Sequence, residues 1–236
     1  MHKVKLLKHT ESPEAIVAAA ARLCYSDDGA EEILDKHKDN AKFIAMLRSI
    51  GHYSPFEHIS FTYSIEGVSR AFLAQVTRHR LASYSVRSQR YVAESNFGYI
   101  TPPAITALGA DAVLEYESQM ATIGEWYNKW RERLGGDKIA NEDARFVLPN
   151  ACETKMIMTA NARELFHFFG LRCCERAQWE IRAVAWDMLK EAYRVAPNIF
   201  AGCGPGCVSK GVCPEGKMSC GKVVQMRERA SKLNIQ

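Results

Sequence analysis

The sequence contains no long hydrophobic run. No apolar segment among its 236 residues approaches the roughly 20 residues needed to span a bilayer. The N-terminal region passes from a short apolar stretch to Lys8 and Glu11, without the apolar core of a signal peptide. We therefore expect a cytoplasmic protein that does not associate with a membrane.

The sequence also lacks the two common glycine-rich loops for nucleotide binding. It has neither a Gly-x-Gly-x-x-Gly pattern after an expected strand nor a Walker loop. The net charge of +4 is too weak by itself to indicate a protein that coats nucleic acid. A dinucleotide cofactor, if one is bound, would have to be held in some other way.

Cysteine is not scarce, but its distribution argues against a disulfide framework. Cys24 and Cys152 are isolated, Cys173 and Cys174 are adjacent, and the C-terminal end holds Cys203, Cys207, Cys213 and Cys220. Without a secretory signal, reduced thiols or a metal site are expected. The last three cysteines, with either Cys203 or Cys174 as a fourth, could bind zinc, although tight Cys-x-x-Cys pairs are missing. The alternative is a set of reduced, loosely packed thiols.

Hydrophobic periodicity predicts an irregular mixture of strands and helices. The clearest strand runs from Glu57 to Ile65 and is broken by Gly67. Ser12 and Ser69 are expected to cap helices, and the second of these would carry Gln75 and Arg78 on one face. Further strands are expected at 4–7 and 153–160, and further helices at 31–49, 112–134, 141–145, 162–171 and 177–195. This mixture favours an α+β fold over a doubly wound sheet.

The segment 78–90 is the most informative part of the chain. It reads Arg-His-Arg-Leu-Ala-Ser-Tyr-Ser-Val-Arg-Ser-Gln-Arg, with four arginines and three serines in thirteen positions. Guanidinium groups suit bidentate contacts to phosphates, and hydroxyl groups add short hydrogen bonds. We expect the segment to begin in the last turn of a helix and to continue as a loop that binds a small phosphorylated ligand. The alternative is a surface loop with solvated arginines.

This segment resembles the signature of the flavin-dependent thymidylate synthases, in which Arg-His-Arg is followed by seven residues and Ser. Other matching pieces occur in that family's order: 51–58, which reads Gly-His-Tyr-Ser-Pro-Phe-Glu-His; Gln75 ahead of Arg78; and 161–163, 171–172 and 176–181. The resemblance extends from His52 to Ile181. Five pieces in the right order make a chance match a poor explanation.

The resemblance implies both an architecture and a reaction. The fold would be α+β, with a central, largely antiparallel sheet flanked by helices, in a single domain over residues 1–200. A cysteine- and glycine-rich extension would occupy 201–236, and a homotetramer would share its active sites between subunits. The family methylates dUMP to dTMP with methylenetetrahydrofolate as carbon donor, FAD as hydride carrier and NADPH as reductant. It uses no cysteine nucleophile, and neither Cys24 nor Cys152 lies in a matched motif.

The resemblance also implies three groups of site residues. The residues expected at the reacting centre are Arg172, His52 and Ser88. Those expected to bind the flavin are Ser54, Arg78, His79, Arg80, Asn161, Ala162, Arg163 and His167. Those expected to bind the nucleotide are Gln75, Arg78, Val86, Arg87, Ser88, Gln89, Arg90, Arg145 and Arg172.

Arg172 has the most specific expected role. A guanidinium near O2 and N3 of uracil would stabilise the ring deprotonated at N3; the alternative is an ion pair with Glu175 or Glu180. His52 would lie against the flavin and help to place the folate, or else be a satisfied histidine at a strand edge. Ser88 is expected to position the nucleotide, because no base lies near it in sequence and the flavin supplies the reducing power.

Three positions depart from the family pattern. Val86 stands where Glu or Gln is usual, Ser85 where Asn is common, and His167 where Asn is frequent. These departures put individual ligand contacts in doubt, but not the class of protein.

Two other functions remain open from the sequence. A module that binds RNA or a nucleotide could use the arginines of segment 78–90, with Tyr84 and Tyr91 as stacking surfaces. A metal-sensing protein could be built on the C-terminal cysteines. The enzyme is the leading interpretation, and it requires no nucleic-acid partner.

Overall fold

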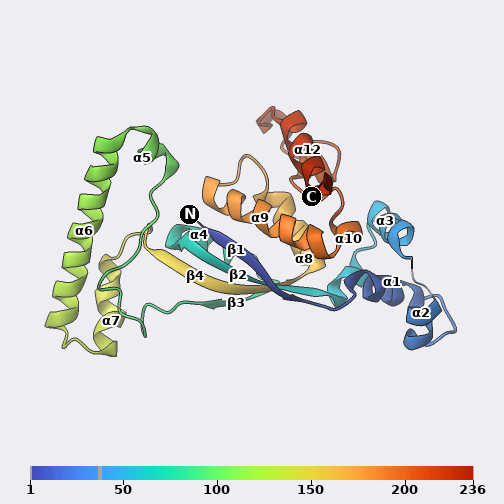
Figure 1. The fold of residues 1–236 in the computed structure, drawn as a ribbon, viewed down its shortest axis with the longest axis horizontal. Helices are drawn as coiled ribbons and strands as arrows, with labels where there is room; N and C mark the ends of the chain where they lie inside the picture. The colour runs from blue at the N-terminus through green and yellow to red at the C-terminus, as the bar shows by residue number, and fades with distance from the viewer. Residues whose placement is uncertain (1, 37–38, 236) are drawn as a thin grey trace. The chain divides into compact units, whose positions relative to one another are not determined.

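A four-stranded sheet in the order β1-β2-β4-β3 forms the framework of the chain (Figure 1). The computed structural model describes residues 2–36 and 39–235. The strands are β1 (Lys3–His9), β2 (Ser60–Ser69), β3 (Ala82–Val86) and β4 (Glu153–Asn161). Backbone bonds from Ala162 to Ile59 and from Arg70 to Cys152 show that β2 and β4 run antiparallel. The predicted α+β class with an antiparallel sheet is therefore confirmed.

Strand β2 follows from the alternation seen in the sequence, with different limits. Phe61, Tyr63 and Ile65 are fully buried, and the residues between them are more exposed. Residues 57–58 belong instead to the short helix η1 (Ser54–His58). The prediction that Gly67 ends the strand is wrong: its φ of 67° is accommodated within β2, which continues to Ser69.

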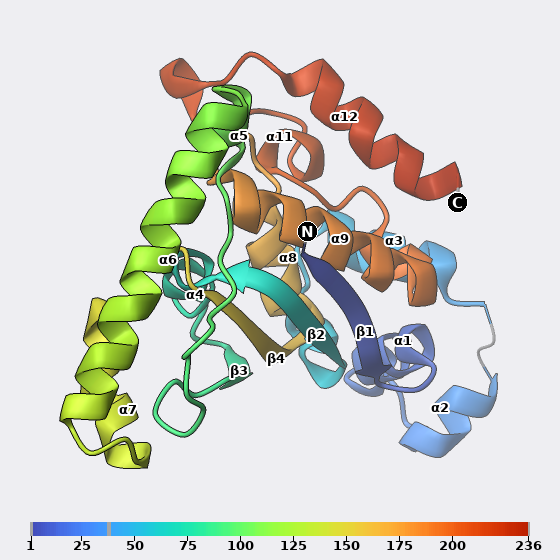
Figure 2. The same cartoon turned by 60° about the vertical axis from the view of Figure 1, so that its left-hand side comes forward.

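The described residues group into two compact units, which we describe separately. The first unit comprises residues 1–2, 65–78 and 85–156. It contains α4 (Arg70–Val76), α5 (Pro103–Ala107), α6 (Ala110–Arg133), α7 (Lys138–Ala144) and η2 (Arg145–Val147). Helices α6 and α7 lie side by side (Figure 2). The buried Tyr127 of α6 donates its hydroxyl to Asn141 of α7 at 3.4 Å and accepts the Glu94 amide at 3.0 Å. These bonds tie α6, α7 and the segment after β3 together.

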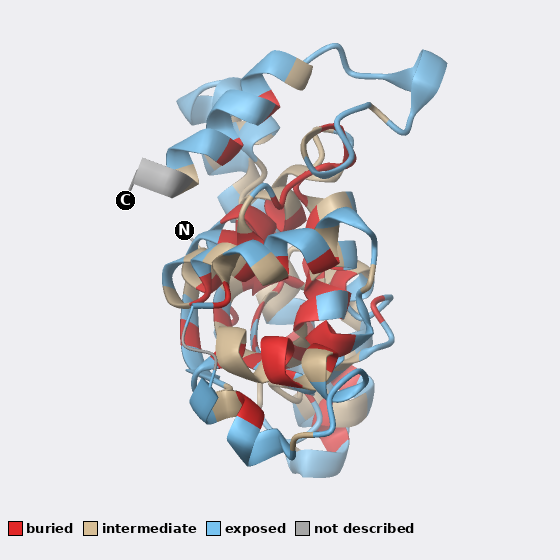
Figure 3. Ribbon diagram, turned by 90° about the vertical axis from the view of Figure 1, so that its right-hand side faces the viewer, coloured by how far each residue is buried: buried red, intermediate tan, exposed pale blue. Residues whose placement is uncertain are grey.

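The second unit comprises residues 3–64, 79–84 and 157–236. Its helices are α1 (Pro13–Leu23), α2 (Ala30–Lys36), α3 (Ala41–Ser49), η1, α8 (Ala162–Arg172), α9 (Trp179–Val195), α10 (Pro197–Phe200), α11 (Gly206–Ser209), η3 (Gly216–Met218), α12 (Val223–Ser231) and η4 (Lys232–Ile235). Its core contains the packed rings of Phe168, Phe169 and Phe200. Helix α12 is mostly exposed (Figure 3).

Several predicted helices are confirmed, and others need correction. Helices α6, α8 and α9 match the predictions closely. The single helix predicted at 31–49 is wrong, because α2 ends at Lys36 and α3 begins at Ala41; residues 37–38 of that prediction lie outside the described residues. Helix α1 begins at Pro13 as expected, but Ser12 has a φ of 46° and its side chain makes no capping bond.

The basic segment 78–90 is not the loop that the sequence predicted. Helix α4 ends at Val76, so Arg78 lies in the turn beyond it, and residues 82–86 form β3. The strand does alternate, with Ala82, Tyr84 and Val86 half-buried and Ser83 and Ser85 exposed, but it is only five residues long and lies among the arginines that suggested a loop. Within the described residues, no helix is both long and apolar enough to cross a membrane.

Replacement of Ser69 by alanine should destabilise the start of α4. The Ser69 hydroxyl accepts the amide of Phe72 at 3.0 Å and is buried, so its loss costs about 1 kcal/mol. We expect the melting temperature to fall by about 2–4 °C in a calorimetric scan. Ser118→Ala, at an exposed position inside α6, is the matched control and should not lower it. An unchanged melting temperature for Ser69→Ala would show that the cap contributes nothing.

Candidate active site

In the first unit, two of the predicted nucleotide-binding arginines meet at one glutamate. The guanidinium of Arg90 donates to the Glu142 carboxylate through Nε and Nη2, both at 2.9 Å. Arg145, at the end of α7, donates from Nε to the Glu142 carbonyl oxygen at 3.0 Å. We call Arg90, Glu142 and Arg145 the arginine cluster. The Arg90–Glu142 pair is about half exposed, so a phosphate can compete for the guanidinium at little cost.

Two other predicted nucleotide-binding residues have side chains engaged inside the first unit. Arg87 donates to the buried Glu94 at 3.2 Å, and its amide bonds the Lys155 carbonyl. The buried Gln89 donates to the Cys152 sulfur at 3.3 Å. The structure therefore gives these two side chains a local structural role. Only their backbone remains for the nucleotide contacts that the resemblance implies.

Ser88 lies between these anchored residues, in a turn. Its hydroxyl accepts the Arg90 amide at 3.3 Å, and its carbonyl oxygen accepts the Val92 amide. Val86, at the end of β3, is half-buried. Gln75 donates to the Ala71 carbonyl within α4, and Arg78 is exposed after that helix. The turn at Ser88 thus carries a polar residue on a well-anchored backbone, which suits a positioning role.

Cys152 is protected from acting as a nucleophile. It is fully buried, and burial raises the pKa of its thiol to about 11, helped by the nearby Glu94 carboxylate. Very little thiolate is then present near neutral pH. This agrees with the expectation that the reaction uses no cysteine nucleophile.

In the second unit, four of the predicted flavin-binding residues lie at the start of α8 or on η1, which packs against it: Asn161, Ala162, Arg163 and Ser54. Asn161 is the N-cap of α8, and its side-chain oxygen accepts the Glu164 amide at 2.9 Å. Ala162 is buried, and its amide bonds the Ile59 carbonyl. Arg163 is about half exposed and pairs with Glu57 of η1, the helix that Ser54 begins. The start of α8 therefore presents an exposed guanidinium beside the exposed hydroxyl-bearing helix η1.

A hydrogen-bond network connects His79 to both ends of α8. The His79 ring donates from Nδ1 to Glu164 at 2.9 Å, and the Arg172 Nε donates to the His79 Nε2 at 3.0 Å. Glu164 was not singled out in the sequence, because a glutamate in the first turn of a helix is common. Its burial, at 5% exposure, is what marks it as unusual. We call Glu164, His79 and Arg172 the His79 network.

The surroundings of His79 favour its neutral form. Burial lowers the pKa of His79; Glu164 acts against this change, while Arg172 and His167 reinforce it. The Tyr84 hydroxyl donates to the His79 carbonyl at 2.9 Å, and burial raises the pKa of that hydroxyl to about 12. Neutral His79 can then accept at one ring nitrogen and donate at the other.

Among the described residues, one set of His, Cys, Asp and Glu side chains brings three possible ligand atoms within 4.8 Å of one another: His79, Glu164 and His167. Both ring nitrogens of His79 already have protein partners. A metal ion would have to displace one of them. We therefore interpret this set as a hydrogen-bond network, in which the exposed His167 lies with its ring 5.6 Å from that of His79.

The C-terminal cysteines do not form a zinc site of known geometry in the described residues. Cys174 and Cys213 lie near enough to Cys207 that they add to burial in raising the pKa of its thiol. Four sulfurs around one zinc ion lie about 3.8 Å apart, and no three cysteine sulfurs in the described residues come within 4.8 Å of one another. The cysteines are free thiols in the structure. The four cysteines of one predicted site, Cys174, Cys207, Cys213 and Cys220, therefore lie in one region, but not at the spacing that a bound zinc ion requires.

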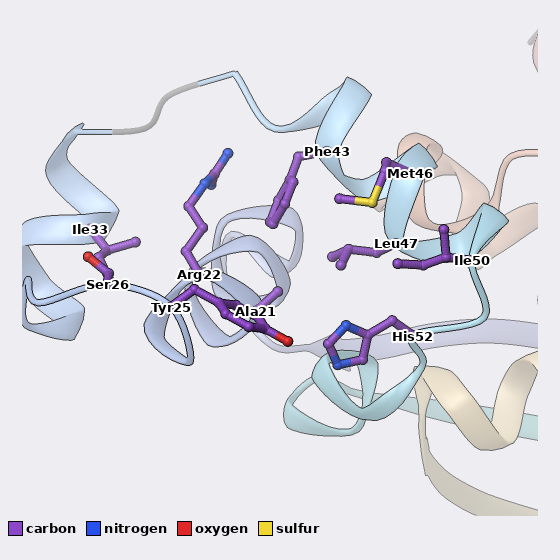
Figure 4. A pocket seen from close by; sticks show the side chains of 10 residues that line it. All are labelled: Ala21, Arg22, Tyr25, Ser26, Ile33, Phe43, Met46, Leu47, Ile50 and His52. Atoms are coloured by element: carbon purple, nitrogen blue, oxygen red, sulfur yellow. The ribbon is translucent and has the colours of Figure 1, made fainter.

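His52 lines a cavity of about 470 Å³ in the second unit (Figure 4). The other lining residues are mostly apolar and come from α1, α2, α3 and the segments that follow α1 and α3: Ala21, Arg22, Tyr25, Ser26, Ile33, Phe43, Met46, Leu47 and Ile50. The rings of Tyr25, Phe43 and His52 border the cavity (Figure 4). An apolar cavity with a few polar groups suits a ring-shaped organic ligand. The aromatic lining was not predicted from the sequence, since it is assembled from separate helices.

The first unit carries exposed arginines suited to a phosphate, and the second carries a buried histidine that bonds a further arginine. Comparison with known proteins makes the class specific. Residues 5–198 match the family model described as thymidylate synthase complementing protein. The flavin-dependent thymidylate synthase of Clostridium tetani is 50% identical over 240 residues, covering 96% of each chain. That of Geobacter sulfurreducens is 49% identical, covering 99% of this chain and 100% of the relative.

A solved structure is also similar. The crystal structure of a UMP/dUMP methylase PolB from Streptomyces cacaoi, bound with 5-Br dUMP, has a TM-score of 0.72 and 26% sequence identity; the match covers 85% of this chain and 93% of that chain. The chain therefore belongs to the family of flavin-dependent thymidylate synthases, which methylate dUMP to dTMP. The predicted family, enzyme class and flavin dependence are confirmed. The family favours the enzyme over the RNA-binding module and the metal sensor.

Replacement of Arg90 by alanine should weaken dUMP binding with little effect on stability. A charge-assisted bond to phosphate contributes about 1.5–3 kcal/mol, so we expect about a tenfold or greater rise in the dissociation constant by titration calorimetry. The exposed pair with Glu142 contributes about 1 kcal/mol or less to folding. Arg133→Ala, which removes a guanidinium that lies over the Trp130 ring at the end of α6, is the control. Equal dUMP affinity for Arg90→Ala and wild type would remove Arg90 from the nucleotide site.

Proposed function

We propose that this enzyme methylates dUMP with methylenetetrahydrofolate as the carbon donor and FAD as the hydride carrier, with NADPH as the reductant. When bound, FAD would supply the hydride that converts the transferred methylene group to a methyl group. The uracil loses its C5 hydrogen as a proton when the new carbon–carbon bond forms. The chain's own residues must therefore bind both ligands and make C5 electron-rich.

The residues at the start of α8 have the chemistry that a flavin nucleotide requires. Arg163 is exposed, and its pair with Glu57 is weak enough to exchange for a pyrophosphate oxygen. Ser54 adds a hydroxyl from η1, and the exposed Arg80 adds a second guanidinium. Asn161 uses its side-chain oxygen for the helix cap, which leaves its NH₂ group as the possible ligand donor. We assign this group, with Arg78, His79, Ala162 and His167, to FAD.

The nucleotide would be held by the residues of the first unit. Arg90 and Arg145 of the arginine cluster are the strongest candidates for its phosphate, since both guanidinium groups bond Glu142: Arg90 its carboxylate and Arg145 its backbone carbonyl oxygen. Ser88, with the backbone around Val86, Arg87 and Gln89, would position the sugar and base. The methylase from Streptomyces cacaoi supports this proposal, since that protein was solved with a brominated dUMP bound.

Arg172 would act on the uracil ring. The Arg172 Nε donates to His79, and this bond fixes the position of the guanidinium. A cation directed at O2 and N3 stabilises the ring deprotonated at N3, and this raises electron density at C5. The placement of Arg172 by a buried partner is the observation that carries this assignment. Its alternative pair with Glu175 loses support, because Glu175 pairs with Arg182 and Lys222.

His52 would contact the flavin ring or the folate through the apolar cavity that it borders. The assembly proposed with this function is a homotetramer that shares its sites between subunits. We also propose that the catalytic domain ends near residue 200, followed by the cysteine- and glycine-rich extension. The match to the family model, which ends at residue 198, supports that division.

Tritium release from 5-tritiated dUMP tests the proposed reaction. Under nitrogen, with FAD, NADPH and methylenetetrahydrofolate all present, the enzyme should release tritium to water because the C5 hydrogen leaves as a proton. Omission of any one component should stop the release. Release without the folate or without the flavin would contradict the proposed carbon and hydride routes. The buffer without enzyme is the control for exchange.

Replacement of Arg172 by alanine should remove turnover and leave flavin binding. The loss of a pre-organised cation at a developing negative charge costs about a hundredfold or more in kcat. Flavin content is measured from its visible absorbance in the same preparation. Arg194→Ala, which breaks an exposed pair on α9, is the control for loss of an arginine. A fully active Arg172→Ala enzyme would refute the role given to Arg172, without affecting the reaction itself.

A further inference from the structure

The His79 network contains a carboxylate to which no ligand contact is assigned. Glu164 and His79 are both buried, at 5% and 4% exposure. A buried carboxylate is costly unless strong partners compensate it. Glu164 accepts the His79 Nδ1 proton at 2.9 Å, and its own amide is bonded by the Asn161 cap at 2.9 Å. The first turn of α8 thus fixes both its backbone and its carboxylate.

The chemistry of the three groups determines where the protons lie. A guanidinium can only donate hydrogen bonds, so the His79 Nε2 that receives Arg172 must carry a lone pair. The ring is then neutral, and its single N–H is on Nδ1, which faces the Glu164 carboxylate. A carboxylate is the partner that best holds an imidazole in this tautomer. The sequence of bonds therefore runs in one direction, from Arg172 through His79 to Glu164.

We propose that Glu164 is a positioning residue for the methylation of dUMP: by fixing the tautomer and orientation of His79, it holds the Arg172 guanidinium in place for the uracil ring. The inference rests on the role proposed above for Arg172. Glu164 touches no substrate in this scheme and acts only through the imidazole. Two observations support this proposal. The His79–Glu164 and Arg172–His79 bonds are 2.9 and 3.0 Å long, and His79 and Glu164 are both buried.

The groups that face His79 also define a pH dependence. On α8 these are Glu164, His167 and Arg172, and on β3 the hydroxyl of Tyr84 bonds the His79 carbonyl. Burial is the largest cause that lowers the pKa of His79, and the Glu164 carboxylate opposes it. Protonation of His79 converts Nε2 into a donor and breaks the bond from Arg172. Activity should therefore be lost on the acid side as His79 gains its proton.

The test is the near-isosteric change Glu164→Gln, assayed by tritium release. Glutamine keeps an acceptor oxygen but loses the charge, and its NH₂ group can occupy the acceptor's place, so the His79 N–H is held more weakly. We expect kcat to fall about tenfold. The KM for dUMP should change less than about threefold, because the arginine cluster binds the phosphate. Removal of the carboxylate charge lowers the pKa of His79 further, so the acid limb of kcat should move to lower pH. A purely structural role would not move that limb.

A second variant tests whether Glu164 acts through His79. In a His79→Gln enzyme, adding Glu164→Gln should lower kcat less than about twofold. If the two residues acted independently, the fold-losses in kcat of the two single variants would multiply. Glu191→Gln, which breaks the exposed pair with Arg194 on α9, is the matched control and should retain the wild-type kcat and acid limb. If Glu164→Gln does not fold with flavin bound, Glu164→Asp takes its place. The aspartate keeps the charge but holds it farther from His79, so kcat should fall and the acid limb should move to lower pH.

The outcomes separate the proposals. A wild-type kcat and acid limb in the Glu164 variant, or multiplied losses in the double variant, would overturn the role of Glu164. An active Arg172→Ala enzyme would instead overturn the role of Arg172. Failure of the wild-type enzyme to release tritium would concern the reaction, and not the network.

Discussion

A guanidinium carries only hydrogen-bond donors, and this constraint determines the direction of the hydrogen bonds around His79 in the second unit. Because Arg172 must donate, the ring of His79 has to offer a lone pair at Nε2, and its proton has to reside on Nδ1. A proton in a buried place then requires an acceptor, which Glu164 provides. The helix α8 can supply both outer members, because Glu164 lies in its first turn and Arg172 in its last. One interaction thus links the local structure of a helix to the chemistry of the site.

The arginines of this enzyme fall into two physical classes. Arg90 and Arg163 make ion pairs in which both partners are about half exposed, with Glu142 and Glu57. Such pairs contribute about 1 kcal/mol or less, and an incoming phosphate can replace the carboxylate. Arg87 and Arg172 instead bond to buried partners, Glu94 and His79. Breaking those bonds would leave a buried polar group without a partner, which is costly. The first class is suited to ligand exchange and the second to fixed orientation.

The sequence predicted the family and the long helices because these depend on local signals. The spacing of Arg78, His79, Arg80 and Ser88 is preserved in the chain itself, and the apolar period of α6 spans several turns. Strand β3 was missed because its alternation covers only five residues, none of them fully buried, within a segment rich in arginine. The roles of Arg87 and Gln89 were not foreseen, because their partners Glu94 and Cys152 are set by tertiary packing. Glu164 was missed for the same reason, since burial cannot be read from a first-turn glutamate.

The buried glutamates also show why the residues of the motif alone do not describe the site. Burial raises the pKa of Glu94 although Arg87 and Arg70 oppose it, and its Oε1 has no hydrogen-bond partner among the described residues. Glu164, by contrast, lies against the ring N–H of His79, which has a use for its charge. A buried carboxylate with one oxygen left without a hydrogen bond is retained at a cost to stability. A buried carboxylate that fixes a tautomer has a reason to remain ionised, and that reason is the orientation of the next group in the chain of bonds.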